Sequence, residues 1–213
     1  MRILAIETAS EACSVALFEG DTFASASLIA HDHRELGRGH AERLIPMIGD
    51  FPDKGQADRL LVSLGPGSFT GVRVGLAAAR ALGVAWKAEV LGYPTLALIA
   101  AMAQLRMTRA LTVCVNGGHG EWFVQDFDAS GLPQNDLASL TPEHAQERQS
   151  HGFLAGNRAR DLADLKGGAS EVLETLPDAR FALQVPQELL TGNLAPLYGR
   201  APDAKPQIQR ATR

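Results

Sequence analysis

The sequence lacks any apolar run near the roughly 20 residues that a membrane-spanning helix needs. Its first residues, MRILAIE, reach the acidic side chain of Glu7 too early for a secretory signal. Cysteine is scarce: Cys13 and Cys114 have no CxxC spacing and imply no disulfide framework, which suits a reducing compartment in which both thiols are buried. We therefore expect a cytoplasmic protein that makes no membrane contacts.

A basic excess is also missing, since the formal net charge is −4. A protein that grips RNA by itself usually carries surplus Lys and Arg, because neutralising phosphates supplies most of the non-specific affinity. Hydrophobic residues make up 46% of the 213 residues and charged residues 21%, a composition that can fill a core. The sequence thus predicts a globular protein whose RNA contacts are local or are left to another protein.

The opening residues have the pattern of an antiparallel meander. Residues 2–7, 13–19 and 22–30 read as strands because they are rich in apolar residues and are separated by polar turns. A polar stretch at 31–40 contains three histidines and is expected to be a loop. Residues 41–50 then have apolar side chains at helical spacing.

Strands and helices alternate in the next part of the chain. A strand is expected at 59–64, a glycine-rich loop at 65–71, a helix at 72–87, a strand at 89–92 and a helix at 94–104. Such alternation predicts parallel crossovers, so the sheet is expected to be mixed.

The second half repeats this pattern. Residues 109–115 resemble the first strand and residues 121–128 the second. Further elements are expected as a helix from Thr141, a strand at 153–156 and a helix at 158–166. The repeat predicts two lobes, 1–105 with the glycine loop and the interface helices, and 106–213, whose last residues either return to the first lobe or end loosely.

The glycine-rich loop is the most distinctive motif, and it comprises Gly65, Pro66, Gly67, Ser68, Phe69, Thr70 and Gly71. No Gly-Lys-Ser/Thr follows, so the lysine of a P-loop is missing. Two interpretations stay open. The loop either places an anion at the helix N-terminus or is a tight strand-to-helix connection in which Ser68 or Thr70 caps the helix.

The helix expected at 72–87 has more apolar circumference than one sheet needs. Arg73, Arg80 and Lys87 share a narrow arc, and the other directions carry apolar or small side chains. An amphipathic helix on its own sheet needs a single apolar stripe, so this one is expected to bury two faces. It is either a crossover enclosed between the lobes or a contact surface for another protein.

Motifs for catalysis are absent. His31, His33 and His40 have neither Hx3H nor HExxH spacing, and Gly65–Ser68 is not a GxSxG motif. We therefore expect neither a metal ligand set nor a catalytic residue in this chain.

Three segments resemble one family. MRILAIETASEACSVAL at 1–17, HAERLIP at 40–46 and above all GPGSFTGVRVGLAAARALG at 65–83 are similar to the TsaB (YeaZ) family, with a weaker echo in NLAPLYGRAPDAKP at 193–206. The resemblance implies an α/β protein with the duplicated two-lobe fold and mixed sheets of the actin/sugar-kinase/Hsp70-like (ASKHA) superfold. Members help to install the threonylcarbamoyl group on the adenosine adjoining the anticodon of tRNA, known as t6A biosynthesis.

The resemblance also implies a division of labour. Catalysis would belong to a TsaD-like subunit, joined by a TsaE-like ATPase, so ATP and metal are expected on those partners and no cofactor on this chain. tRNA would be reached only through the complex, and a homodimer is possible in isolation. The sequence departs from the family at Asn116–Phe123, NGGHGEWF, where many members read Asp-Ala-Arg-x-Gly-Glu-Val-Tyr.

The helices at 72–87 and 41–50 are expected to form the docking surface for the catalytic partner. The contact residues expected there are His40, Leu44, Arg73, Ala77, Arg80, Ala81 and Val84, and the loop Gly65–Gly71 is expected near a nucleotide or the partner. Two other functions remain as alternatives: a small phosphotransferase of the same superfold, favoured by the glycine loop and Glu7, and a metallopeptidase. The first needs phosphate-binding glycine turns, which Thr8–Glu11 lacks, and the second needs metal ligands.

Overall fold

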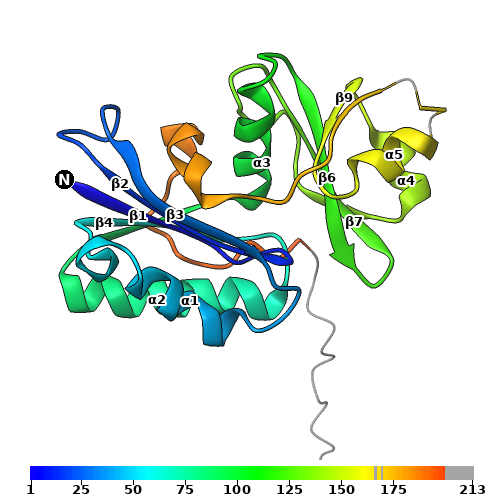
Figure 1. The fold of residues 1–213 in the computed structure, drawn as a ribbon. Helices are drawn as coiled ribbons and strands as arrows, with labels where there is room; N and C mark the ends of the chain where they lie inside the picture. The colour runs from blue at the N-terminus through cyan, green and yellow to red at the C-terminus, as the bar shows by residue number, and fades with distance from the viewer. Residues whose placement is uncertain (166, 169, 200–213) are drawn as a thin grey trace, which may run out of the picture.

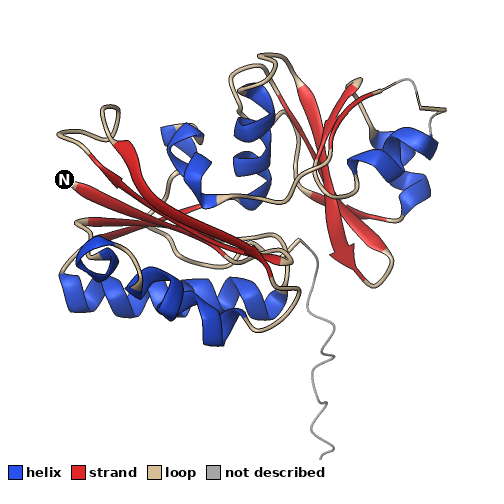
Figure 2. Cartoon of the chain, viewed as in Figure 1, coloured by secondary structure: helices blue, strands red, loops and turns tan. Residues whose placement is uncertain are grey.

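The computed structural model describes residues 1–165, 167–168 and 170–199, and these residues form two five-stranded mixed sheets with helices around them (Figures 1 and 2). The predicted α/β class with mixed sheets is therefore confirmed. None of the helices in this part of the chain is long and apolar enough to cross a membrane.

The first sheet has the strand order β3-β2-β1-β4-β5. Its strands are β1 (Arg2–Glu7), β2 (Ala12–Glu19), β3 (Ser27–Glu35), β4 (Arg59–Ser63) and β5 (Glu89–Tyr93). β1 pairs antiparallel with β2 and parallel with β4, as the meander followed by crossovers predicted. Nearly every residue of β1 and β2 is buried, because both faces of the sheet are covered.

The second sheet repeats this arrangement, with the order β10-β9-β6-β7-β8. Its strands are β6 (Leu111–Gly118), β7 (Glu121–Phe127), β8 (Ala138–Leu140), β9 (Phe153–Ala155) and β10 (Glu171–Leu173). β6 takes the place of β1, since it pairs antiparallel with β7 and parallel with β9. The repeat inferred from the sequence is thus a repeat of sheet topology.

The helices lie in three layers. They are α1 (His40–Gly49), α2 (Phe69–Trp86), α3 (Thr95–Gln104), α4 (Pro142–Arg148), α5 (Ala159–Leu165) and the 3-10 helices η1 (Pro52–Gly55), η2 (Ala179–Gln184) and η3 (Gln187–Leu189). α1 and α2 cover the outer face of the first sheet, and α4 and α5 that of the second (Figure 1). Between the sheets lie α3 and η2, which follow the last strand of the first and second sheet respectively.

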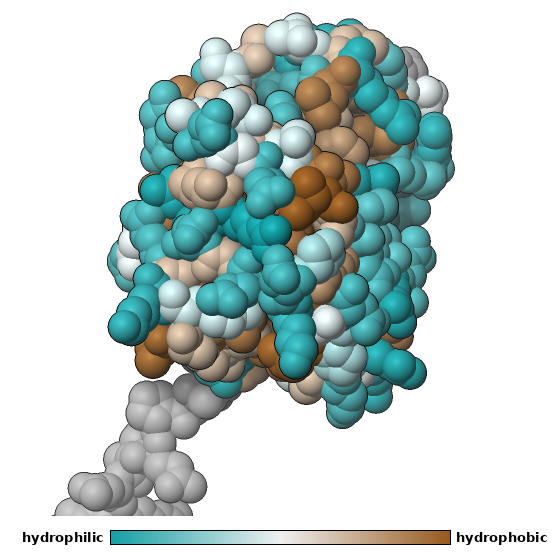
Figure 3. Space-filling model, turned by 60° about the vertical axis from the view of Figure 1, so that its left-hand side comes forward, coloured by the Kyte–Doolittle hydropathy of each residue, from teal (hydrophilic) through white to brown (hydrophobic). Residues whose placement is uncertain are grey.

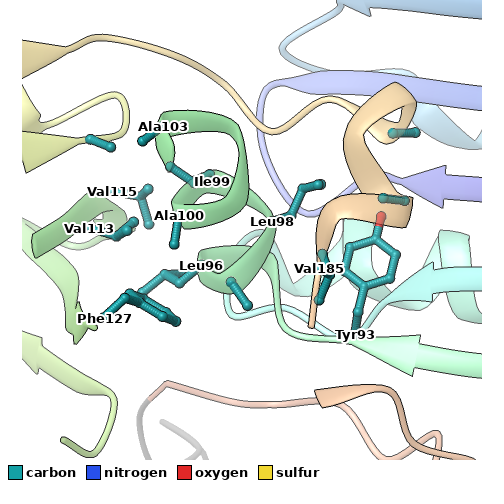
Figure 4. Packing of buried hydrophobic residues seen from close by; sticks show 14 of the residues in the cluster. Tyr93, Leu96, Leu98, Ile99, Ala100, Ala103, Val113, Val115, Phe127 and Val185 are labelled. Carbon is teal, nitrogen blue, oxygen red and sulfur yellow. The ribbon is translucent and has the colours of Figure 1, made fainter. Parts of the chain in front are cut away.

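The layer between the sheets is the main core. α3 is buried on almost every side, because its apolar residues contact both sheets. In Figure 4, Ala100 and Ala103 lie toward Val113 of β6, while Leu98 lies on the side of Val185 and Tyr93. One apolar cluster therefore joins the two lobes across the proposed division at residue 105.

One expectation from the sequence is wrong, and one of two interpretations left open for another element is excluded. The strand expected at 22–30 begins at Ser27 and continues to Glu35, so His31 and His33 lie in β3 and not in a loop. Antiparallel pairing with β2 extends the strand, since His31 faces Ala16 and His33 faces Ser14 in the register.

The second correction concerns α2. This helix lies outside the first sheet, so it is not a crossover enclosed between the lobes (Figure 1). It begins at Phe69, earlier than expected, with Ser68 as its N-cap residue. α3 fills the enclosed position instead, because its apolar residues leave no polar stripe to expose.

The chain returns to the first lobe after β10. Ser14 Oγ donates a hydrogen bond to Asp178 Oδ1 at 3.3 Å and accepts one from Ala179 N at 3.0 Å, which ties η2 to β2. Further along, Thr191 bridges to Gly92 at the edge of β5. The first lobe therefore contains residues from both parts of the sequence; residues 200–213 of the expected loose end lie outside the described residues.

Candidate functional site

A cleft of about 870 Å³ lies between the two lobes. It opens beyond the ends of the parallel strands β1, β4, β6 and β9, the place where ligands enter open α/β sheets. Its walls are the turn after β1, the glycine loop, the turn after β6, and the segments 175–177 and 197–199. Apolar side chains predominate, including Phe69, Ile99, Phe123, Leu176 and Leu197.

The glycine loop packs directly on the turn that follows β1. A Cβ atom added at Gly67 would lie 2.0 Å from Ala9 O, and one added at Gly71 would lie 2.0 Å from Thr8 O. Real side chains do not approach backbone oxygens so closely, so both positions require glycine. The glycines therefore serve close contact between two backbone segments.

Three backbone N–H groups of the loop donate hydrogen bonds within the chain. Ser68 N donates to Ala9 O at 2.7 Å, and Ser68 Oγ accepts from Gly71 N at 3.2 Å. Gly65 N donates to Ser63 Oγ at 3.2 Å. A phosphate cradle needs several backbone N–H groups directed at the ligand. Of the two interpretations of the loop, these contacts support the capped strand-to-helix connection.

Glu7 ends β1 beneath this loop and is fully buried. Its Oε1 accepts a hydrogen bond from Ala9 N at 2.7 Å, while Oε2 has no hydrogen-bond partner among the described residues. Burial, which disfavours the charged carboxylate, raises the pKa of Glu7 to about 7, and the hydrogen bond from Ala9 opposes this only in part. Glu7 is thus a carboxyl group that exchanges a proton near neutral pH.

Glu7 belongs to a polar row that crosses the first sheet. In the strand register Glu7 faces Ser14 of β2, and Ser14 faces His33 of β3; on the other side, Ser63 pairs with Tyr93. Tyr93 donates its hydroxyl hydrogen bond to a carbonyl of β1 at 3.0 Å. The row lies on the face toward η2, where polar side chains bind the returning chain.

Two expected contact residues are buried in the chain itself. His40 is 7% exposed, and its Nε2 donates to Ala12 O at 3.2 Å. Leu44 is 1% exposed and packs in the core beneath α1. Both side chains stabilise the position of α1 on the sheet, so neither belongs to a docking surface. No group of three metal-ligating side chains is found in the described part of the chain.

The expected contact residues of α2 lie at its surface. Ala77, Ala81 and Val84 are exposed, Val84 to 83%. The face turned forward in Figure 3 has separate hydrophobic patches among hydrophilic residues, as is usual for a protein surface. The three residues of α2 instead follow one another along one side of a helix.

The two arginines of α2 contact the C-terminal segment. Arg80 Nη2 donates to Leu194 O at 2.9 Å, and Arg73 Nη2 donates to the Tyr198 hydroxyl at 3.2 Å. The Arg73 guanidinium also lies 3.5 Å from the centroid of the Phe69 ring. Sequence reasoning missed these contacts; the echo NLAPLYG was the only signal for them.

A second contact missed from the sequence crosses the cleft. Asn157 Nδ2 donates to Glu11 Oε2 at 3.2 Å, and Asn157 Oδ1 accepts from Asn116 N at 2.9 Å. Asn116 opens the stretch that departs from the family pattern. The second lobe thus reaches the turn after β1 through an asparagine that no motif marked.

Known proteins resemble this chain over most of its length. A family model described as "TsaD: tRNA N6-adenosine threonylcarbamoyltransferase" matches residues 32–140. The tRNA threonylcarbamoyladenosine biosynthesis protein TsaB of Escherichia coli (strain K12) is 36% identical over 160 residues, which is 70% of this chain and 66% of that protein. A tRNA N6-adenosine threonylcarbamoyltransferase of Anaeromyxobacter sp. (strain Fw109-5) is 27% identical over 212 residues, 90% of this chain and 61% of that protein.

Among solved structures, YeaZ from Pseudomonas aeruginosa is 25% identical and superposes with a TM-score of 0.70 over 86% of this chain and 89% of that one. Two lobes of one repeated mixed-sheet topology around a cleft define a protein of the ASKHA superfold. Within that superfold, the chain belongs to the TsaB (YeaZ) family. The matches span two thirds or less of the length of the curated relatives named above.

The close packing of the glycine loop leads to a test. Gly67→Ala should lower the free energy of unfolding by about 1–3 kcal/mol, because its methyl group meets a backbone oxygen that cannot move alone. Gly49→Ala is the matched control, since a Cβ there meets nothing within 4 Å. Urea unfolding monitored by circular dichroism measures both; equal effects of the two substitutions would contradict the packing argument.

The raised pKa of Glu7 predicts a pH dependence. Below about pH 4.5 the carboxyl is protonated in both states, and the stability that the protonated form contributes is lost as the pH rises through about 7. Glu7→Gln should therefore raise the free energy of unfolding at pH 8 by on the order of 3 kcal/mol relative to wild type, and the gain should shrink toward pH 5.

Urea titrations of both proteins at several pH values measure this difference. Glu174→Gln is the control, because the residue at that position is exposed. A stability difference between Glu7→Gln and wild type that stays constant from pH 5 to pH 8 would show that Glu7 does not titrate in this range.

Proposed function

We propose that the chain is a non-catalytic partner that activates a TsaD-like catalytic subunit in t6A biosynthesis, the threonylcarbamoylation of tRNA. The names of its relatives support the pathway. The contact between the glycine loop and the turn after β1 supports the non-catalytic role, because the N–H groups of Ser68 and Gly71 are already engaged within the chain. ATP and metal then belong to the partner subunits.

The docking face that we propose consists of Ala77, Ala81 and Val84 of α2 together with Ile45 of α1, which is 51% exposed. Small side chains allow two helix backbones to approach closely. Because the chain itself matches the TsaD family model, the catalytic subunit is expected to carry an equivalent pair of outer helices. Two related folds then pair through the same surface, as two copies of this chain would in a homodimer.

The remaining partners follow from the complex. A TsaE-like ATPase is expected to join the two subunits, and the catalytic subunit is expected to hold the tRNA. The net charge of −4 agrees with this, since the chain has no surplus of positive charge for the RNA backbone.

The phosphotransferase remains the second candidate, because Glu7 lies at the end of β1 close to the cleft. General acid–base chemistry suits a carboxyl group with a pKa of about 7. However, Glu7 is fully buried and is not among the residues that line the cleft, whereas Ala9 and Ser68, which contact each other, do line it. The accessory role therefore has the stronger support.

The proposed docking face predicts that a charged or bulky side chain on α2 weakens binding of the partner. Ala77→Glu and Ala81→Trp should each weaken binding of the TsaD-like subunit at least tenfold, because a charge or a large ring is placed where two helices meet. Both side chains point to solvent in the chain alone, so the fold should persist. Size-exclusion chromatography and isothermal titration calorimetry with the partner measure binding.

Ala129→Glu is the matched control, since Ala129 is exposed in a turn of the second lobe. Circular dichroism confirms that each variant is folded. If folded Ala77→Glu binds the partner as tightly as wild type and Ala129→Glu do, the docking face lies elsewhere on the molecule.

The accessory role also predicts the activity of the chain alone. Purified without its partners, it should release no phosphate from ATP and should not modify tRNA. Adding the TsaD-like subunit, the TsaE-like ATPase and the threonylcarbamoyl donor should restore modification. Phosphate release by the chain alone that disappears in Glu7→Gln would favour the phosphotransferase instead.

A further inference from the structure

The C-terminal segment Asn193–Gly199, which we name the clasp, is anchored to the first lobe at both ends of its course. Just before it, Thr191 and Gly92 exchange backbone hydrogen bonds of 3.0 and 2.8 Å, which adds a residue pair to the edge of β5. Near its end, Leu197 N donates to Leu64 O at 2.8 Å, beside the glycine loop. The clasp therefore runs beside the β5 edge of the first sheet, from Gly92 to Leu64.

α2 holds the clasp between these anchors. Arg80 binds the carbonyl oxygen of Leu194, and Arg73 binds the hydroxyl of Tyr198. These arginines lie one helical turn on either side of Ala77, the centre of the proposed docking face. Both hydrogen bonds between α2 and the clasp are therefore donated by residues that lie next to the proposed docking face.

The end of the clasp reaches the second lobe. A Cβ atom added at Gly199 would lie 2.2 Å from the ring of Phe123 in β7. Leu197, Tyr198 and Gly199 also line the cleft, opposite the turn after β6. The clasp is therefore a wall of the cleft that connects the docking helix of one lobe with a strand of the other.

From this course of the chain we propose that the clasp couples docking on α2 to the separation of the two lobes. A partner seated on the docking face removes water from the exposed bond between Arg80 and Leu194 O, and hydrogen bonds strengthen when water is excluded. The clasp is then held more firmly, and through Gly199 and Phe123 it holds the second lobe against the first. The coupling to a TsaD-like partner rests on the proposed function.

The coupling is reciprocal. If docking shifts the equilibrium of the clasp toward the closed form by some factor, the closed form must bind the partner more tightly than the open form by the same factor. A change that opens the clasp therefore weakens docking. The apolar cluster around α3 and η2 and the contact between Asn157 and Glu11 do not involve the clasp, so the lobes remain joined when the clasp opens. Loosening the clasp is therefore expected to widen the range of lobe separations without unfolding either lobe.

The first part of the test uses the chain alone. Gly199→Ala places a methyl group against Phe123, whereas the control Gly192→Ala places one where nothing lies within 4 Å. Hydrogen exchange of the Leu197 amide reports on the clasp. Spin labels on Asp21→Cys and Arg160→Cys, both exposed and outside the clasp and the docking face, report the lobe separation, since Cys13 and Cys114 are buried.

Gly199→Ala should speed exchange of the Leu197 amide at least fivefold and broaden the distance distribution, whereas Gly192→Ala should leave both unchanged. Arg80→Met removes the hydrogen bond to Leu194 but keeps the aliphatic stem, and it should speed the same exchange. Unchanged exchange in both folded variants, Gly199→Ala and Arg80→Met, would overturn the proposal.

The second part adds the TsaD-like partner. In wild type and in Gly192→Ala it should slow exchange at Leu197 about fivefold or more, within the range of allosteric couplings, and narrow the distance distribution. The Gly199→Ala variant should still bind the partner, but binding should not narrow its distance distribution. If wild type binds the partner but its distance distribution does not narrow, the coupling is overturned and the proposed function is not. Absence of any binding by wild type overturns the proposed function and the coupling to docking together.

Discussion

The packing of the glycine loop against the turn after β1 determines how the rest of the first lobe is arranged. Gly67 and Gly71 bring two backbone segments to a separation that no side chain allows. This contact fixes the start of α2 on the sheet, forms one wall of the cleft and engages the N–H groups of Ser68 and Gly71. A loop that resembles a nucleotide-binding motif in composition therefore serves as a joint between strand and helix.

The two lobes share a sheet topology but differ in the helices that cover the outer face of each sheet. In the first lobe α2 runs for 18 residues and leaves a row of small side chains at the surface. Its counterpart α5 has 7 residues, too few to offer a comparable face. The third helices of the repeat, α3 and η2, pack together between the sheets. Duplication therefore produced one lobe with a long outer helix and one in which the corresponding helix is short.

The sequence allowed prediction of the topology better than of the contacts between lobes. Strand and helix periodicity located β1, β2, β4 and α1 within a residue or two, because those elements have a clear apolar pattern. The helical periodicity of residues 72–87 predicted which alanines of α2 are exposed, but it did not predict the contacts of Arg73 and Arg80 with the C-terminal segment. Contacts such as Ser14 with Asp178 join residues far apart in the chain, and no local pattern specifies them. The bounds of β3 were predicted wrongly because this edge strand contains His31 and His33, and a polar stretch of this kind is also typical of a loop.

The return of Thr191 and Leu197 to the first sheet also bears on biosynthesis of the chain. During translation the first lobe emerges early, but the edge of β5 has no neighbour until the ribosome has added almost all of the second lobe. An unpaired strand edge invites association with other chains. The nascent protein thus carries an unpaired β5 edge through most of its synthesis, and Gly92 of that edge pairs with Thr191 only late.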